Sequence, residues 1–191
     1  MLRMFKDPIL QKLYKKYGPH KFEDRSEKLL EELIESVISQ QLSNKAAATI
    51  YSRFLKLFNN KFPSIKQILD TDLEILRSAG MSYSKGQYIK NIAKAFEDKL
   101  IEVDKIKKMT DDKVIENLTK IKGVGKWTAE MTLIFTLKRE DVFSIGDAGL
   151  RKAIKKLYNL ERDSDILKLT EEWKPKRSFA SWYLWRSLEN D

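Results

Sequence analysis

Asp147 has the residue type and position for catalytic chemistry. It follows Gly146 where a new amphipathic helix is expected to begin, and it stands 20 residues after Trp127 (147 − 127). An Asp in this setting ordinarily caps the helix with its side chain. The spacing also lets the chain run out along one helix and return beside its start, so that a carboxylate and an aromatic ring would face one cleft. A carboxylate there can act as a base or stabilise positive charge, and one residue can both cap and react.

Two glycines one residue apart, Gly123 and Gly125, interrupt an apolar helical run that restarts at once. Glycine allows a tight turn because it has no Cβ, and such a turn leaves the N–H groups of the second helix free to bind an anion. The pattern predicts a helix-hairpin-helix motif, although ordinary helix ends also use glycine. A DNA phosphate is the natural anion here. We therefore predict DNA contacts from Lys122, Gly123, Val124, Gly125, Lys126 and Thr128.

The elements that position these residues are expected to be helices, because apolar residues recur with the helical period and no alternating strand pattern is present. The sequence therefore predicts an all-α fold. Apolar stripes indicate helices near residues 29–38, 46–58, 83–99 and 150–158. Arg151 lies on the basic outer face of the last of these helices. That face is either solvated or follows DNA phosphates.

Composition limits the alternatives. The 191 residues, 42% of them hydrophobic, suffice for one compact unit with a core, and the net charge of +9 suits a polyanionic partner. Charge alone leaves nucleic acid and a merely soluble surface equally open. The absence of Cys excludes disulfides, thiolate zinc and a Cys-bound iron–sulfur cluster, and His20, the single His, lies in a loop sequence. With no apolar run of membrane length and no signal-peptide core, we expect an intracellular protein of the cytoplasm or nucleoid.

Three further segments bear on the assignment: residues 38–47, rich in Gln and Ser, residues 80–89, which include Gly80, Ser82 and Lys85, and residues 173–185. Together with the hairpin and the Asp147 segment, and in the same order, they resemble the helix-hairpin-helix DNA glycosylase superfamily. Within it the chain is most similar to the 3-methyladenine DNA glycosylase II (AlkA) type. The resemblance runs from about residue 27 to residue 185.

The resemblance implies one glycosylase unit over residues 1–191, built of two helical lobes with the active-site cleft between them. The central lobe would span about residues 37–137, and the terminal lobe would combine residues 1–36 with 138–191. AlkA-type enzymes often carry an extra N-terminal β-rich domain, and this chain resembles a minimal form without it. The implied partner is damaged double-stranded DNA, and the implied state is a monomer without membrane contact.

The resemblance also assigns roles in the cleft. Asp147 would stabilise the oxocarbenium-like sugar and activate water as the N-glycosidic bond of a flipped-out base is hydrolysed. Trp127, Met131 and Trp185 would line the base pocket, with core packing as the alternative for both tryptophans. Gln41 would be the wedge that fills the gap left by the flipped nucleotide, and its alternative is a polar turn residue.

Position 127 decides the reaction type, because bifunctional relatives have a Schiff-base-forming Lys there. Lys126 is one residue off, about 100° around the helix. The resemblance therefore implies a monofunctional glycosylase for 3-methyladenine and 7-methylguanine that needs no catalytic cofactor. The main-chain carbonyls of Thr119, Ile121 and Val124 would bind Na⁺ or K⁺. Two alternatives stay open: a bifunctional glycosylase/lyase for oxidised or deaminated bases, and a non-catalytic DNA-binding hairpin module.

Overall fold

All regular elements of the computed structural model are helical over the described residues, 4–189, which confirms the predicted all-α fold. No helix in that range is long and apolar enough to cross a membrane. The α-helices are α1 (Pro8–Tyr17), α2 (Leu29–Ser39), α3 (Asn44–Lys56), α4 (Ile65–Asp70), α5 (Leu73–Ser78), α6 (Tyr83–Glu97), α7 (Val103–Lys108), α8 (Asp111–Thr119), α9 (Lys126–Met131), α10 (Ala148–Tyr158), α11 (Asp163–Glu171) and α12 (Arg177–Arg186). Short turns are the 3₁₀ turn η1 (Ser26–Lys28) and the π-helical turn η2 (Thr132–Thr136), which follows α9 directly.

The chain forms two compact units whose boundaries differ from the predicted lobes. The central unit comprises residues 25–132, where we predicted about 37–137. The terminal unit joins the N-terminal residues up to 24 with those from 133 onward. The two divisions of the chain differ by about twelve residues at the first crossover and by about five at the second.

Packing explains both shifts. Helix α2 lies against α3 and α6, so its residues and the turn before it belong to the central unit. After the π-helical turn begins, the Phe135 ring contacts Phe22 at 5.9 Å and Trp185 at 5.6 Å between centroids, both in the terminal unit. Periodicity alone predicts where a helix runs and which face is apolar, but it does not identify the helices against which that face packs.

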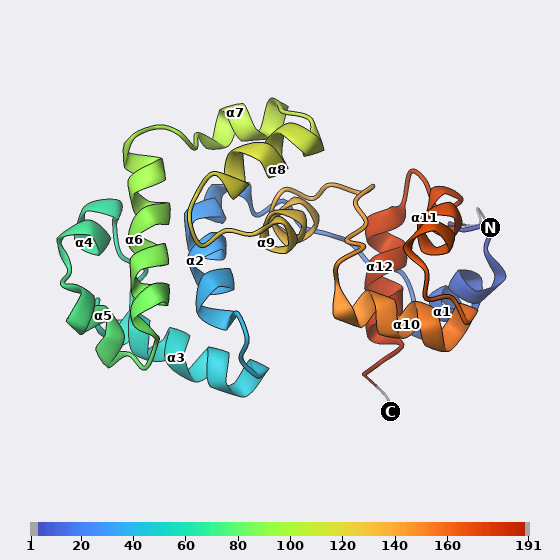
Figure 1. Ribbon diagram of the computed structural model, residues 1–191, viewed down its shortest axis with the longest axis horizontal. Coiled ribbons are helices and arrows are strands. Elements are labelled where there is room, and N and C mark those ends of the chain that lie inside the picture. Colours follow the sequence, from blue (N-terminus) through green and yellow to red (C-terminus); the bar gives the residue numbers. More distant parts are fainter. Residues whose placement is uncertain (1–3, 190–191) are drawn as a thin grey trace. The chain divides into compact units, whose positions relative to one another are not determined.

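Helix α6 is the centre of the central unit, where it packs against α2, α4 and α5 (Figure 1). The Ser82 side chain caps it by accepting from the Lys85 N–H at 3.3 Å. Ile89 and Ile92 are fully buried, and each contributes roughly 1.5–3 kcal/mol by leaving water. Gly86 faces α5, where even a Cβ would lie in contact with Leu73 at 3.5 Å.

The terminal unit is built around α12, which packs against α1 and α10 (Figure 1). Asp7 connects its parts. One carboxylate oxygen accepts from the Leu10 N–H at 2.8 Å and from the Tyr158 hydroxyl at 3.0 Å, while the other accepts from the Trp173 indole at 3.4 Å. Burial, together with the Asp7 charge, raises the pKa of Tyr158, which keeps this hydroxyl a donor. Asp7 therefore fixes α1 to α10 and to the turn that leads into α12.

Candidate functional site

The predicted hairpin is present between α8 and α9, and its two glycines are needed for different reasons. Gly123 has φ +109°, and a Cβ added there would lie 2.3 Å from Cγ of Tyr88. Only glycine fits, because the left-handed backbone and the Tyr88 ring both exclude a side chain. Gly125 is the N-cap of α9 with φ −87°, and a Cβ there would meet nothing within 4 Å. A side chain at this position would therefore project into open space.

Side chains of neighbouring helices hold the hairpin backbone. The Asn91 side chain donates to the Lys122 carbonyl at 3.0 Å, and the Gln40 side chain donates to the Gly123 carbonyl at 3.2 Å. Gln40 also approaches the Thr128 hydroxyl at 3.5 Å. Thr128 is only 2% exposed, so its side chain packs inside the unit. A contact between Thr128 and DNA stays a prediction.

The backbone of this turn also bears on the predicted cation site. The Ile121 carbonyl accepts from the Val124 N–H at 2.9 Å, which closes the turn. A carbonyl oxygen has two lone pairs, so this bond leaves the oxygen able to coordinate a cation. Main-chain oxygens of Thr119, Ile121 and Val124 are the donor type that Na⁺ and K⁺ accept, and the site stays a prediction.

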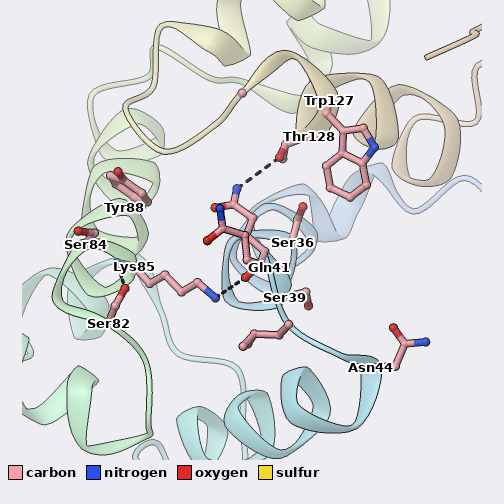
Figure 2. Close-up of a pocket in the computed structure, with 13 residues that line it drawn as sticks. Ser36, Ser39, Gln41, Asn44, Ser82, Ser84, Lys85, Tyr88, Trp127 and Thr128 are labelled. Carbon is pink, nitrogen blue, oxygen red and sulfur yellow. Dashed lines mark hydrogen bonds between the residues drawn. The ribbon is translucent and has the colours of Figure 1, made fainter. Parts of the chain in front are cut away.

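The two neighbouring glutamines at the end of α2 have different roles. The Gln40 side chain donates to the hairpin within the central unit. Gln41, in contrast, is exposed and has the left-handed φ of +58°. The Lys85 ammonium donates to the Gln40 carbonyl at 2.7 Å (Figure 2). It also donates to the Ile38 carbonyl at 2.8 Å, so it binds the C-terminal end of α2. Partial burial lowers the pKa of Lys85. The exposure of Gln41 is compatible with a wedge, and that role stays a prediction.

A cavity of about 870 Å³ opens between the end of α2, the start of α6 and the start of α9 (Figure 2). Most of the residues that line it are of polar, uncharged types: Ser36, Ser39, Gln40, Gln41, Leu42, Asn44, Ser82, Ser84, Lys85, Tyr88, Gly125, Trp127 and Thr128. The Trp127 residue is 44% exposed, which rules out the alternative that it is a core residue. An exposed indole is a π-face that a flat aromatic ligand can stack on.

Asp147 lies in the terminal unit, where it caps a helix, and its catalytic role stays a prediction. It is 8% exposed and is the N-cap of α10. Its Oδ1 accepts from the Leu150 N–H at 2.7 Å and from the Trp185 indole N–H at 2.9 Å. Capping is thus established, and the same bonds fix the direction of the carboxylate. The Trp185 N–H therefore orients the candidate catalytic carboxylate, and a role for its ring in the base pocket stays a prediction.

Gly149 was not predicted as a site residue, yet a side chain there would crowd the candidate site. A Cβ at this position would lie 3.1 Å from Asp147 Oδ1 and 3.1 Å from Trp185 Cδ1. Any larger residue would press on the hydrogen bond between them. The Asp147-Ala148-Gly149 spacing was the available signal, but nothing in the sequence indicated that Trp185 packs over it.

The loop that leads to Asp147 is fastened to the start of α12. The Arg177 guanidinium binds the Asp141 carboxylate through two bonds, at 2.8 and 3.0 Å. Ser178 accepts from the Val142 N–H at 3.0 Å and donates to the Arg139 carbonyl at 2.6 Å. Paired bonds of this kind are strong and directional. They therefore set where the chain delivers Asp147.

Two further residues, the predicted Met131 and the unpredicted Phe135, follow Trp127 along the chain. Met131 is the last residue of α9 and is partly exposed. Phe135, which was not predicted, is 37% exposed and its ring lies 5.6 Å from that of Trp185. Its position four residues after Met131, about one helical turn, was the signal that could have identified it. The terminal unit, which contains Asp147, thus has an exposed aromatic residue in Phe135, as the central unit has in Trp127.

The predicted basic residues differ in how closely an acidic side chain pairs with each of them. Lys122 is exposed, and Lys126 is exposed with its ammonium 3.9 Å from the Glu130 carboxylate. Arg151, in contrast, binds Asp163 at 2.6 Å and the Glu161 carbonyl at 3.0 Å. A phosphate contact from Arg151 would have to share the guanidinium with Asp163. The structure places the hairpin, Gln41 and Trp127 in one unit and Asp147 with Trp185 in the other, and their meeting in one cleft stays a prediction.

Comparisons with known proteins give a consistent result. A family model described as HhH-GPD superfamily base excision DNA repair protein matches residues 34–176. DNA-3-methyladenine glycosylase 1 of Schizosaccharomyces pombe is 40% identical over 183 residues, which cover 93% of this chain and 80% of that protein. A solved S. pombe 3-methyladenine DNA glycosylase in complex with abasic DNA has a TM-score of 0.85 at 38% identity, covering 97% of this chain and 93% of that one. A DNA-3-methyladenine glycosidase from Bacillus halodurans has a TM-score of 0.79 at 31% identity, covering 97% and 91%.

Proposed function

Because this chain belongs to the HhH-GPD superfamily of base excision DNA repair proteins, we propose that it is a monofunctional DNA glycosylase that removes alkylated purines from double-stranded DNA. The observation that carries the proposal is the buried carboxylate of Asp147, oriented by the Leu150 and Trp185 N–H groups. Its relatives named for 3-methyladenine suggest that base as a substrate, and we add 7-methylguanine because it too is a cationic alkylated purine. The hairpin and the net charge of +9 suit the DNA backbone.

The proposed reaction is hydrolysis at the sugar C1′. The C1′–N bond breaks and the base leaves with the bonding electrons, so positive charge builds up on the deoxyribose. A fixed carboxylate beside that charge stabilises the transition state, since it needs no reorganisation when the charge appears. Water then bonds to C1′ and gives a proton to Asp147. The two N–H bonds to Oδ1 hold the carboxylate in place throughout this sequence.

Base preference follows from the aromatic residues. Trp127 and Phe135 are exposed rings, and Trp185 presents its ring beside Phe135. An aromatic face attracts cations, and 3-methyladenine and 7-methylguanine nucleotides carry positive charge on the purine. That charge also weakens the glycosidic bond, because the base leaves as a neutral molecule. We therefore infer that such a site prefers cationic alkylated bases to neutral oxidised ones.

The proposal is tested by treating duplex DNA with a methylating agent, incubating it with the protein and identifying the released bases by chromatography. We expect 3-methyladenine and 7-methylguanine in solution, with the DNA strands intact. Untreated duplex is the control and should release nothing. Absence of both methylated bases, with DNA binding retained, would favour the non-catalytic module instead.

We predict that borohydride traps no covalent complex between this protein and damaged DNA. Trapping requires an amine that forms a Schiff base with the sugar, and position 127 is Trp rather than Lys. The measurement is gel electrophoresis after reduction, with alkali cleavage of a parallel sample to show that abasic sites were made. Trapping that disappears in Lys126→Ala would show instead that the neighbouring lysine acts as the nucleophile.

We also predict that Trp127→Ala slows release of 7-methylguanine by about tenfold, whereas Trp127→Phe slows it by less than about threefold. Stacking of a base on an aromatic ring contributes roughly 1–3 kcal/mol, and Phe keeps a π-face. Since Trp127 is 44% exposed, neither change should unfold the protein. Single-turnover rates provide the measurement. Equal losses in the two variants would exclude stacking as the role of this ring.

A further inference from the structure

One face of α6 contacts both loops that are expected to meet DNA. Lys85, Tyr88 and Asn91 are spaced by three residues, so they occupy neighbouring positions on the helix surface. Lys85 bonds to the end of α2 beside Gln41, whereas Tyr88 and Asn91 lie against the hairpin. The other side of α6 is buried against the helices of its own unit. The helix is thus a rigid connection between two exposed loops that are far apart in sequence.

Lys85 stabilises the turn at residues 40–42, which we call the Gln41 turn. Its ammonium donates to two carbonyls, of Ile38 and Gln40, that lie where α2 has run out of helical partners. A cation at this end also opposes the negative end of the helix dipole. The next residue, Gln41, adopts φ +58°, a conformation that non-glycine residues disfavour. Lys85 therefore stabilises the backbone immediately before a strained, exposed residue.

The hairpin is held by the same helix through different chemistry. The Asn91 amide donates to the Lys122 carbonyl at 3.0 Å, and its own oxygen accepts from Gln87 at 3.1 Å, which orients it. The Tyr88 ring fills the space beside Gly123, so the turn cannot shift toward α6 without a clash. Gln40 adds a direct bond from the end of α2 to the Gly123 carbonyl. The turn and the hairpin are consequently fixed to each other by way of α6.

We propose that α6 is a brace that sets the spacing between the Gln41 turn and the hairpin, with Lys85 as the positioning residue for the turn. Lys85 acts through Gln41 and not by touching the substrate. Its removal should impair extrusion of the base, while contacts to phosphate from the hairpin persist. The rate measurement below rests on the proposed glycosylase function, whereas the exchange measurement does not.

Lys85→Met is the test variant, because it keeps the aliphatic length and removes the charge and the donors. Lys90→Met is the matched control. Lys90 lies on the same helix, and its ammonium donates at 2.8 Å to the carbonyl of Leu69 near the end of α4, away from both loops. Lys85→Arg tests rescue, since a guanidinium can donate to two acceptors.

In Lys85→Met we expect the single-turnover rate of 7-methylguanine release to fall about tenfold or more, since small misplacements of positioning groups cost that much. Affinity for undamaged duplex should stay within about twofold. Lys90→Met should match the parent protein in both, and Lys85→Arg should recover most of the rate. If Lys85→Met instead weakens binding to undamaged duplex as much as it slows release, Lys85 is a phosphate contact and the brace is wrong.

Hydrogen exchange of the DNA-free protein gives a second readout. The Leu42 N–H donates to the Ser39 carbonyl at 3.1 Å across the Gln41 turn. We expect this amide to exchange faster in Lys85→Met and unchanged in Lys90→Met. Unchanged exchange in both would overturn the proposal. If the parent protein released no base from any methylated duplex, the proposed function would fail, and exchange at Leu42 would still decide whether Lys85 holds the turn.

Discussion

Asp147→Asn should lower the rate of base release by about 10²-fold or more while leaving the fold and DNA binding nearly intact. The amide keeps an oxygen that can accept from the Leu150 and Trp185 N–H groups, which lie 2.7 and 2.9 Å from Oδ1. What it loses is the negative charge beside the sugar, and it can no longer take a proton from water. The measurement is the single-turnover rate with saturating enzyme, together with the melting temperature and the affinity for duplex.

The capping role needs its own control, because Asp147 is also the N-cap of α10. Asp72→Asn provides it: Asp72 caps α5, and its carboxylate accepts from the Glu74 N–H at 3.2 Å. This change should leave base release unaltered. Turnover by Asp147→Asn close to that of Asp72→Asn would mean that the carboxylate is structural and that another group activates the water.

Gly123→Ala should destabilise the protein by about 3 kcal/mol and abolish tight DNA binding, whereas Gly125→Ala should leave stability within about 1 kcal/mol. A Cβ introduced at Gly123 would lie 2.3 Å from Tyr88 Cγ on a backbone with φ +109°. At Gly125 the same atom meets nothing within 4 Å, so the substitution should leave the packing of the hairpin unchanged. Thermal unfolding and binding to duplexes measure the two effects.

Gly125→Ala is thus the cleaner probe of the hairpin. We expect it to weaken binding to damaged and undamaged duplexes alike, because the contact is to phosphate and not to a base. Gly146→Ala, another position with open space around it, is a suitable control for the loss of a glycine. Weaker binding of a single lesion only, or no change in any affinity, would show that the hairpin does not approach the backbone.

Much of this arrangement could be predicted from local patterns. The hairpin depends on glycine spacing, and the capping position of Asp147 depends on the start of an apolar stripe, so both are encoded within a few residues. The left-handed backbone at Gln41 and its exposure fit the alternative of a polar turn residue and are also compatible with the predicted wedge. Local signals of this kind act within one helix or one turn, which is why they are readable in the sequence.

Contacts between distant segments could not be predicted in the same way. The bond from Trp185 to Asp147 joins residues 38 positions apart, and that from Lys85 to Ile38 joins residues 47 apart. The burial of the Thr128 side chain, which is only 2% exposed, was likewise not apparent from its position just after the hairpin. The unit boundaries shifted because α2 packs against α3 and α6. Each of these features depends on which helices pack against one another in the folded protein.

The proposed mechanism is tested most directly by comparing two duplexes that differ in a single base, 7-methylguanine in one and 8-oxoguanine in the other. A carboxylate that stabilises a cationic sugar, together with aromatic faces that attract a cationic base, predicts faster single-turnover release of 7-methylguanine by about tenfold or more. Release should leave an intact abasic strand. Equal or faster release of 8-oxoguanine would contradict the account and would require a pocket that recognises a neutral base by hydrogen bonds.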